Sequence, residues 1–232
     1  MRFVLALLVG VSLLCGCDDE SKSVQQAAAP PSATVTPREG IAVAIVVDVS
    51  GSMGQSVNDV GGHQSPKIDI AQRAVKQLYE RSEKFSKDNA ERSLEVSLYA
   101  FNDQPSQMIQ FAKPAATGAN AVIDQLRPNG GTGIGRAILK AKADLDATGL
   151  SQKHIVVVTD GENTDGPTPA EVATEMSKNP AKPAVYMVAF DVNADIFQKV
   201  KSDGWLVYSA SDAKELQQAL DVIFGENILL ER

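Results

Sequence analysis

The chain of 232 residues has a formal net charge of −7, from 22 basic and 29 acidic residues. Its length suits one domain of roughly 200 residues with a sizeable core. The acidic balance argues against nucleic acid and against an anionic lipid surface as main partners. The two cysteines, Cys15 and Cys17, both lie near the N-terminus. We therefore expect the folded part to be stable in an oxidising compartment without disulfides.

Residues 1–16 have the pattern of a targeting signal. A positive start at Arg2 precedes an apolar run over residues 3–14, which is too short to span a membrane. Leu14-Cys15-Gly16-Cys17 resembles the bacterial lipobox. The resemblance implies cleavage before Cys17, lipidation of its sulfur and stable membrane anchoring by the acyl chains. A secretory leader cut elsewhere and an uncleaved anchor are the alternatives.

Residues 17–39 are rich in Ser, Gln, Ala and Pro and lack a hydrophobic period, which predicts a lipidated, disordered tether. Asp18 and Asp19 resemble the signal that retains enteric-type lipoproteins in the inner membrane; an acidic start to the tether is the alternative reading. The expected location is a bacterial cell envelope, with the folded domain in the periplasm and the inner membrane favoured as its anchor.

Buried strands and amphipathic helices alternate over residues 40–225, which predicts a single domain followed by a C-terminal tail at 226–232. In chain order we expect a strand at 41–47, a polar loop at 55–65, a helix at 66–86, strands at 94–101 and 108–111, helices at 119–126 and 133–145, a strand at 155–159, a helix at 168–177, a strand at 184–190, a helix at 195–201, a strand at 205–208 and a helix at 213–224.

Several of these strands are continuous apolar runs, as is typical of strands covered on both faces. The pattern predicts an α/β fold with a doubly wound, mostly parallel central sheet, helices on both faces and one antiparallel edge strand. In such sheets, ligands bind beyond the carboxyl ends of the strands, beside the point where the strand order reverses.

Hard oxygen ligands follow the first predicted strand directly. Asp48, Ser50 and Ser52 alternate with Val49 and Gly51, and the glycine permits the tight bend that brings them together. Carboxylate and hydroxyl oxygens suit a small hard cation such as Mg²⁺, or Mn²⁺ in vitro, rather than zinc.

Two later segments supply further oxygen ligands. Thr132 lies in a glycine-rich turn that opens a predicted helix, and Asp160 directly follows the strand predicted at 155–159. Because Asp48 and Asp160 both follow buried strands, we expect them at the same edge of the sheet.

The set Asp48, Ser50, Ser52, Thr132 and Asp160 resembles the metal-ion-dependent adhesion site (MIDAS) of von Willebrand factor type A (VWA) domains, in residue types, order and spacing. The resemblance covers about residues 40–225. It implies a Rossmann-like VWA fold, one bound Mg²⁺, and an open coordination position that takes a carboxylate from a partner protein.

Three more residues are candidates for a recognition rim around the metal. His63 lies in the polar loop after the metal motif, and Asn102 and Asp103 follow the strand at 94–101. The simpler interpretations are a solvated histidine and an ordinary turn.

The predicted function is a lipid-anchored, metal-dependent protein-binding module and not an enzyme. A scaffold whose metal is purely structural is the main alternative. A Mg²⁺-dependent hydrolase that uses Asp48 as its nucleophile is disfavoured, because dehalogenase-like enzymes need an acid where this chain has Ser50. A serine hydrolase is disfavoured because no G-x-S-x-G elbow is present.

Overall fold

In this computed structural model, which describes residues 37–230, a six-stranded sheet has the strand order β5-β4-β1-β6-β7-β8. All neighbouring strands are parallel except β4 and β5, so the antiparallel strand is at the edge. The strands are β1 (Arg38–Asp48), β4 (Leu94–Phe101), β5 (Pro105–Ala112), β6 (Leu150–Thr159), β7 (Ala184–Phe190) and β8 (Leu206–Ala210). The predicted fold class is confirmed.

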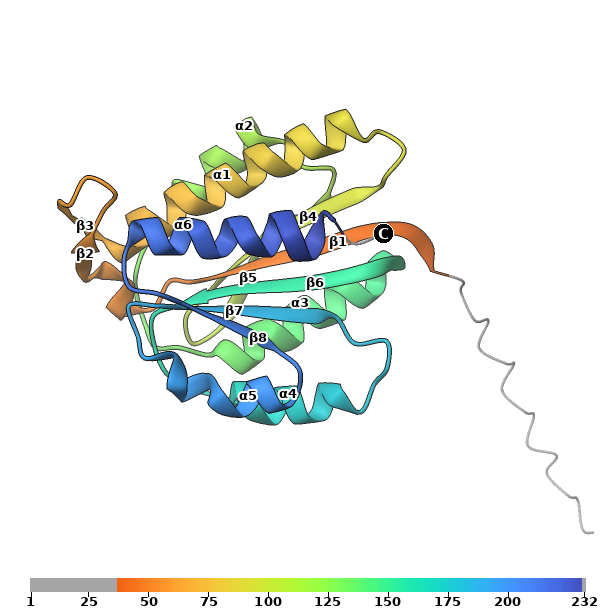
Figure 1. Cartoon of the computed structure of the whole chain (residues 1–232). Helices are drawn as coiled ribbons and strands as arrows, with labels where there is room; N and C mark the ends of the chain where they lie inside the picture. The colour runs from red at the N-terminus through yellow and green to blue at the C-terminus, as the bar shows by residue number, and fades with distance from the viewer. Residues whose placement is uncertain (1–36, 231–232) are drawn as a thin grey trace, which may run out of the picture. The chain divides into compact units, whose positions relative to one another are not determined.

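Helices cover both faces of the sheet (Figure 1). Helices α1, α2 and α6 pack on one face and α3, α4 and α5 on the other. The helices are α1 (Lys67–Asp88), α2 (Ala116–Ile123), α3 (Ile134–Thr148), α4 (Pro169–Ser177), α5 (Gln198–Ser202) and α6 (Ala213–Val222). Two short 3₁₀ helices, at Gly51–Gly54 and Ala194–Phe197, and a π-helix at Ile223–Ile228 complete them.

Strand β1 lies between β4 and β6 in the middle of the sheet, and both of its faces are buried. Its odd-numbered residues Val43, Ile45 and Val47 belong to the core beneath α1 and α6, while Ala42 and Ala44 belong to the core beneath α3. Side chains that alternate between two dry cores explain why residues 41–47 of this strand are all apolar.

Local sequence signals set the start of α4 as predicted. The Thr168 hydroxyl accepts a hydrogen bond from the Glu171 backbone N–H, and the Glu171 carboxylate accepts one from the Thr168 N–H. This reciprocal capping satisfies amides at the start of α4, and Pro169 occupies the first turn, where it needs no donor.

Several predicted boundaries differ from the structure. The loop predicted at 55–65 contains a short hairpin of β2 (Ser56–Asn58) and β3 (Gln64–Pro66), which polar three-residue strands do not reveal by periodicity. Strand β1 starts at Arg38, inside the predicted tether. Helix α2 starts at Ala116 instead of residue 119. The π-helix continues the last helix into the predicted tail, and the signal and the tether up to residue 36 lie outside the described residues.

Helix α3 needs a glycine where it crosses the loop before α4. A Cβ at Gly135 would lie 1.9 Å from the carbonyl oxygen of Pro167, which is backbone and cannot swing away. We predict that Gly135→Ala lowers the free energy of unfolding by about 1–3 kcal/mol in urea denaturation. Gly118→Ala is the matched control, because Gly118 is an exposed position of α2 and no atom lies within 4 Å of the new Cβ. We expect it to raise stability by about 0.5 kcal/mol. Equal effects of the two substitutions would refute the packing argument.

His154 gives the fold a specific acid sensitivity. It lies buried in β6 beside the Tyr186 hydroxyl, and burial lowers its pKa from 6.5 to about 4. Between these values the unfolded chain binds a proton at this histidine that the folded chain does not, so the contribution of His154 to the free energy of unfolding should fall as the pH drops from 6.5 to 4, by up to about 3 kcal/mol. His154→Gln should remove this part of the pH slope in urea titrations, whatever its effect on absolute stability. An unchanged slope would contradict the assignment.

Candidate metal centre

Asp48 ends the central strand with its carboxylate buried in the protein. One carboxylate oxygen, Oδ1, accepts the Ser50 backbone N–H at 2.7 Å, and Oδ2 accepts the Thr159 hydroxyl at 2.6 Å from the neighbouring strand β6. The residue has no exposed surface, and no Lys, Arg or His among the described residues pairs with it. Burial raises the pKa of the Asp48 carboxyl to about 6, and the hydrogen bonds from Ser50 and Thr159 oppose only part of that shift.

A chain of side-chain hydrogen bonds connects the first loop to the end of β6. The Ser50 and Ser52 hydroxyl oxygens lie 3.0 Å apart, and the Ser52 hydroxyl donates to Asp160 Oδ1 at 2.8 Å. The two serines and the two aspartates therefore form one cluster at the carboxyl edge of the sheet, although Asp48 and Asp160 are more than a hundred residues apart in sequence.

Thr132 comes to the same edge on the turn before α3. The Gly51 N–H donates to the Gly130 carbonyl at 3.0 Å, which ties this turn to the serine loop. Thr132 is buried, and its hydroxyl oxygen lies 3.9 Å from the position of a Cβ on Gly161, the residue after Asp160. This hydroxyl makes no hydrogen bond to the part of the chain that the structure describes, so it is available to a ligand.

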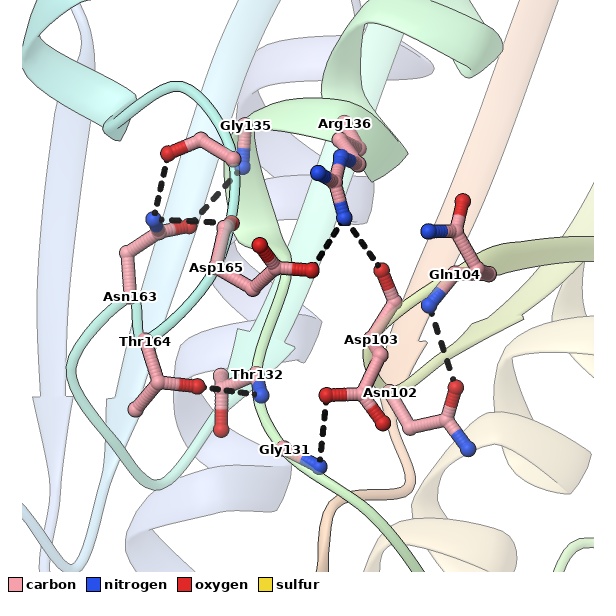
Figure 2. Close-up of polar contacts among 11 residues, drawn as sticks. Asn102, Asp103, Gln104, Gly131, Thr132, Gly135, Arg136, Asn163, Thr164 and Asp165 are labelled. Atoms are coloured by element: carbon pink, nitrogen blue, oxygen red, sulfur yellow. Dashed lines mark hydrogen bonds and ion pairs between the residues drawn. The ribbon is translucent and has the colours of Figure 1, made fainter.

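A network of polar contacts from neighbouring loops holds the Thr132 turn in place, as Figure 2 shows. Two hydrogen bonds connect Thr132 with Thr164: the Thr132 N–H donates to the Thr164 hydroxyl, and the Thr164 N–H donates to the Thr132 carbonyl, both at 2.8 Å. The Arg136 guanidinium donates a hydrogen bond to the backbone carbonyl of Asp103 and forms an ion pair with the carboxylate of Asp165. Because three loops share these bonds, displacement of any one of them would disturb the position of Thr132.

Asn102 and Asp103 belong to this network. The Asp103 carboxylate accepts the Gly131 N–H at 3.1 Å, and the Asn102 carbonyl accepts the Gly133 N–H at 2.6 Å. They were candidates for a recognition rim, and the structure gives them contacts that brace the Thr132 turn.

A buried ammonium lies on the other side of Asp160. Lys67 opens α1, is 3% exposed, and its Nζ lies 2.9 Å from Asp160 Oδ2 and 2.9 Å from Asp191 Oδ2. Burial lowers the pKa of Lys67, but its hydrogen bonds to Asp191 and Asp160 outweigh burial and raise the pKa overall, so the side chain is charged at neutral pH. Asp191 follows β7 and has a positive φ of 53°.

His63 lies at the tip of the β2–β3 hairpin, which extends from the carboxyl edge of the sheet (Figure 1). Its imidazole is 85% exposed and lies 3.7 Å from Asp59 Oδ1. The Asp59 carboxylate also accepts the N–H groups of Gly61 and His63 and the Ser65 hydroxyl, which fixes the shape of the tip. Val60, at the same tip, is 78% exposed.

The donors in this cluster fit a small hard cation. Asp48 carries a desolvated carboxylate that pairs with no cation in the described part of the chain, and the hydroxyls of Ser50, Ser52 and Thr132 supply neutral oxygens at the same edge of the sheet. Within residues 37–230, no three His, Cys, Asp or Glu side chains converge as a metal cluster, so hydroxyls have to complete the ligand set. That composition disfavours zinc and suits Mg²⁺ or Mn²⁺.

Sequence reasoning missed several members of the site, including Lys67 and Asp191. Asp191 had the same signal as Asp48, an Asp directly after an apolar strand. Lys67 had a weaker signal, because a cation in the first turn of a helix opposes the helix dipole and needs a compensating partner. Nothing in the local sequence of Thr159, Thr164 or Arg136 distinguishes it from an ordinary strand, loop or helix residue.

Comparison with known proteins agrees with this geometry. The family model described as the von Willebrand factor type A domain matches residues 42–222. The chain is 28% identical over 206 residues to the uncharacterized protein YwmD of Bacillus subtilis strain 168, covering 82% of this chain and 88% of YwmD.

Two solved structures share the fold. A von Willebrand factor type A protein from Catenulispora acidiphila has a TM-score of 0.61 at 20% identity, and the PilB minor pilin from Streptococcus sanguinis has 0.64 at 16%. The matches cover 78% and 83% of this chain but 41% and 62% of those chains, so this chain spans only part of their length. The family model covers most of the sequence, and the strand order places Asp48 and Asp160, at the ends of adjacent parallel strands, at one edge of the sheet. The chain therefore belongs to the von Willebrand factor type A domain family.

Proposed function

We propose that this protein is a membrane-anchored module that binds a partner protein through one Mg²⁺ held at the carboxyl edge of the sheet. VWA domains are typically non-enzymatic adhesion or interaction modules, and we propose the same for this chain. The observation that carries the proposal is the cluster of Asp48, Ser50, Ser52 and Asp160, in which the buried carboxylate of Asp48 pairs with no cation of the described residues.

Each site residue has a distinct part in this proposal. Asp48 and Asp160 supply negative charge, Ser50 and Ser52 supply neutral oxygens, and Asp160 also orients the Ser52 hydroxyl through its 2.8 Å hydrogen bond. Thr132 supplies a further hydroxyl from a braced turn. When bound, the metal offers a Lewis-acidic position to an acidic side chain of the partner. Neutral hydroxyls leave much of the cation's charge unneutralised, which favours an anionic ligand.

The hairpin tip is the proposed recognition rim. Val60 and His63 are exposed there, and the hairpin begins just after the turn that carries Ser52. An exposed apolar side chain beside a metal-held carboxylate would let the domain distinguish partners by the residues that flank their acid.

The proposed anchor is the lipid on Cys17, which lies outside the described residues. Within residues 37–230, none of the helices has the length and apolar character needed to cross a bilayer. We propose that the domain resides in the periplasm, held at the inner membrane.

A scaffold with a purely structural metal is the second candidate, favoured by the dense bracing around Thr132. Chelation distinguishes the two. Under the binding proposal, EDTA abolishes capture of the partner from detergent-solubilised membranes while the domain stays folded. Under the scaffold proposal, EDTA unfolds the domain.

Asp48→Asn should reduce Mg²⁺ affinity by at least about 100-fold in calorimetric titration, because it removes the site's uncompensated charge while preserving the shape of the side chain. Asp221→Asn, which removes a carboxylate paired with Arg81 on the surface, is the control and should bind Mg²⁺ as the wild type does. Wild-type affinity in a folded Asp48→Asn variant would remove the basis of the proposed function.

Cys17→Ser should abolish incorporation of labelled fatty acid and move the protein from the membrane to the soluble or unprocessed fraction, because the serine oxygen cannot form the thioether. Cys15→Ser is the matched control and should still be acylated. A Cys17→Ser protein that remains acylated and membrane-bound would show that the lipoprotein assignment is wrong.

A further inference from the structure

The buried ammonium of Lys67 divides its contacts between a residue of the metal site and a residue outside the metal motif. Its Nζ lies at 2.9 Å from both Asp160 Oδ2 and Asp191 Oδ2. The side chains of Lys67 and Asp160 are 4% and 0% exposed, whereas that of Asp191 is 40% exposed. Solvent therefore screens the Asp191 contact more than the Asp160 contact.

This contact leaves Asp160 with both carboxylate oxygens engaged. Oδ1 accepts the Ser52 hydroxyl, and Oδ2 accepts the Lys67 ammonium. Asp48, by contrast, accepts only from an amide and a hydroxyl. The two carboxylates of the site thus differ in charge compensation: one has a cation within the protein and the other does not.

We propose that Lys67 is an internal cation that competes with the divalent metal for Asp160 and thereby limits how tightly the site holds its metal. This inference rests on the proposed function and names a positioning residue for it. Two cations near one carboxylate in a poorly solvated site repel each other, so the ammonium weakens metal binding. The same ammonium stabilises the protein without metal, because it offsets the buried charge of Asp160.

Asp191 sets the strength of this competition. It draws the ammonium toward the end of β7 and adds a negative charge near the site. When Asp191 loses its charge, the Lys67 ammonium should interact more strongly with Asp160, and the affinity of the site for the metal should fall. Lys67 and Asp191 therefore have opposite effects on metal affinity, although they are partners in one ion pair.

A purely structural ion pair predicts something different. If Lys67 only ties α1 to the ends of β6 and β7, removal of either partner should lower stability equally with and without metal, and Mg²⁺ affinity should stay the same. The sign of the change in metal affinity, and not its effect on stability alone, separates the two roles.

The test uses Lys67→Met, which keeps the length of the side chain, and Asp191→Asn, in which asparagine tolerates the positive φ. Lys76→Met is the control, because Lys76 lies on the same helix and pairs with Asp124 away from the site. Mg²⁺ affinity is measured by calorimetric titration, and melting temperature is measured in EDTA and in saturating Mg²⁺.

We expect Lys67→Met to bind Mg²⁺ about ten-fold more tightly, to melt lower than wild type in EDTA, and to gain more from Mg²⁺. Asp191→Asn should bind Mg²⁺ several-fold more weakly, and Lys76→Met should match the wild type. Unchanged or weaker Mg²⁺ binding by a folded Lys67→Met would overturn the inference. If Lys67→Met does not fold, unchanged affinity in Asp191→Asn overturns it and weaker affinity supports it. If the wild-type protein binds no Mg²⁺, the proposed function is refuted, and this inference is refuted with it.

Discussion

The buried carboxylate of Asp48, which pairs with no cation among residues 37–230, is the constraint on which the rest of this structure depends. Burial of Asp48 costs free energy that two neutral hydrogen bonds offset only in part. Helices cover both faces of the parallel strand β1, and its last residue is still buried. The fold itself therefore removes the Asp48 side chain from water. The sheet thus creates the buried charge that, in the proposed function, a divalent cation neutralises.

The surrounding loops solve a second problem, which is to hold neutral oxygens near that carboxylate. Hydroxyls are weak ligands unless they are already in position. Here the serine loop is joined to the Gly130 turn through its backbone, and Thr132 is held by a pair of bonds to Thr164. Gly130 has a positive φ of 72° and leaves room for the Asp103 carboxylate, so the turn and its brace depend on each other.

Much of the architecture could be predicted from the sequence because its signals are local. Apolar runs predicted the buried strands, and the Thr168-Pro169 start predicted α4. The positions of Asp48 and Asp160 after such runs placed them at one edge. The Lys67–Asp160–Asp191 contact could not be predicted in the same way, because it joins three segments through side chains whose directions depend on packing. The β2–β3 hairpin also escaped prediction, since its short polar strands are stabilised by Asp59 and not by a hydrophobic period.

We propose that one hard cation binds among Asp48, Ser50, Ser52, Thr132 and Asp160. Crystals of the domain grown with Mn²⁺, examined by anomalous scattering at the manganese edge, test it most directly. We expect a single strong anomalous peak within coordination distance of the Ser50 and Ser52 hydroxyls, with water or a neighbouring carboxylate at one coordination position. A well-ordered site without an anomalous peak, at millimolar Mn²⁺, would contradict it.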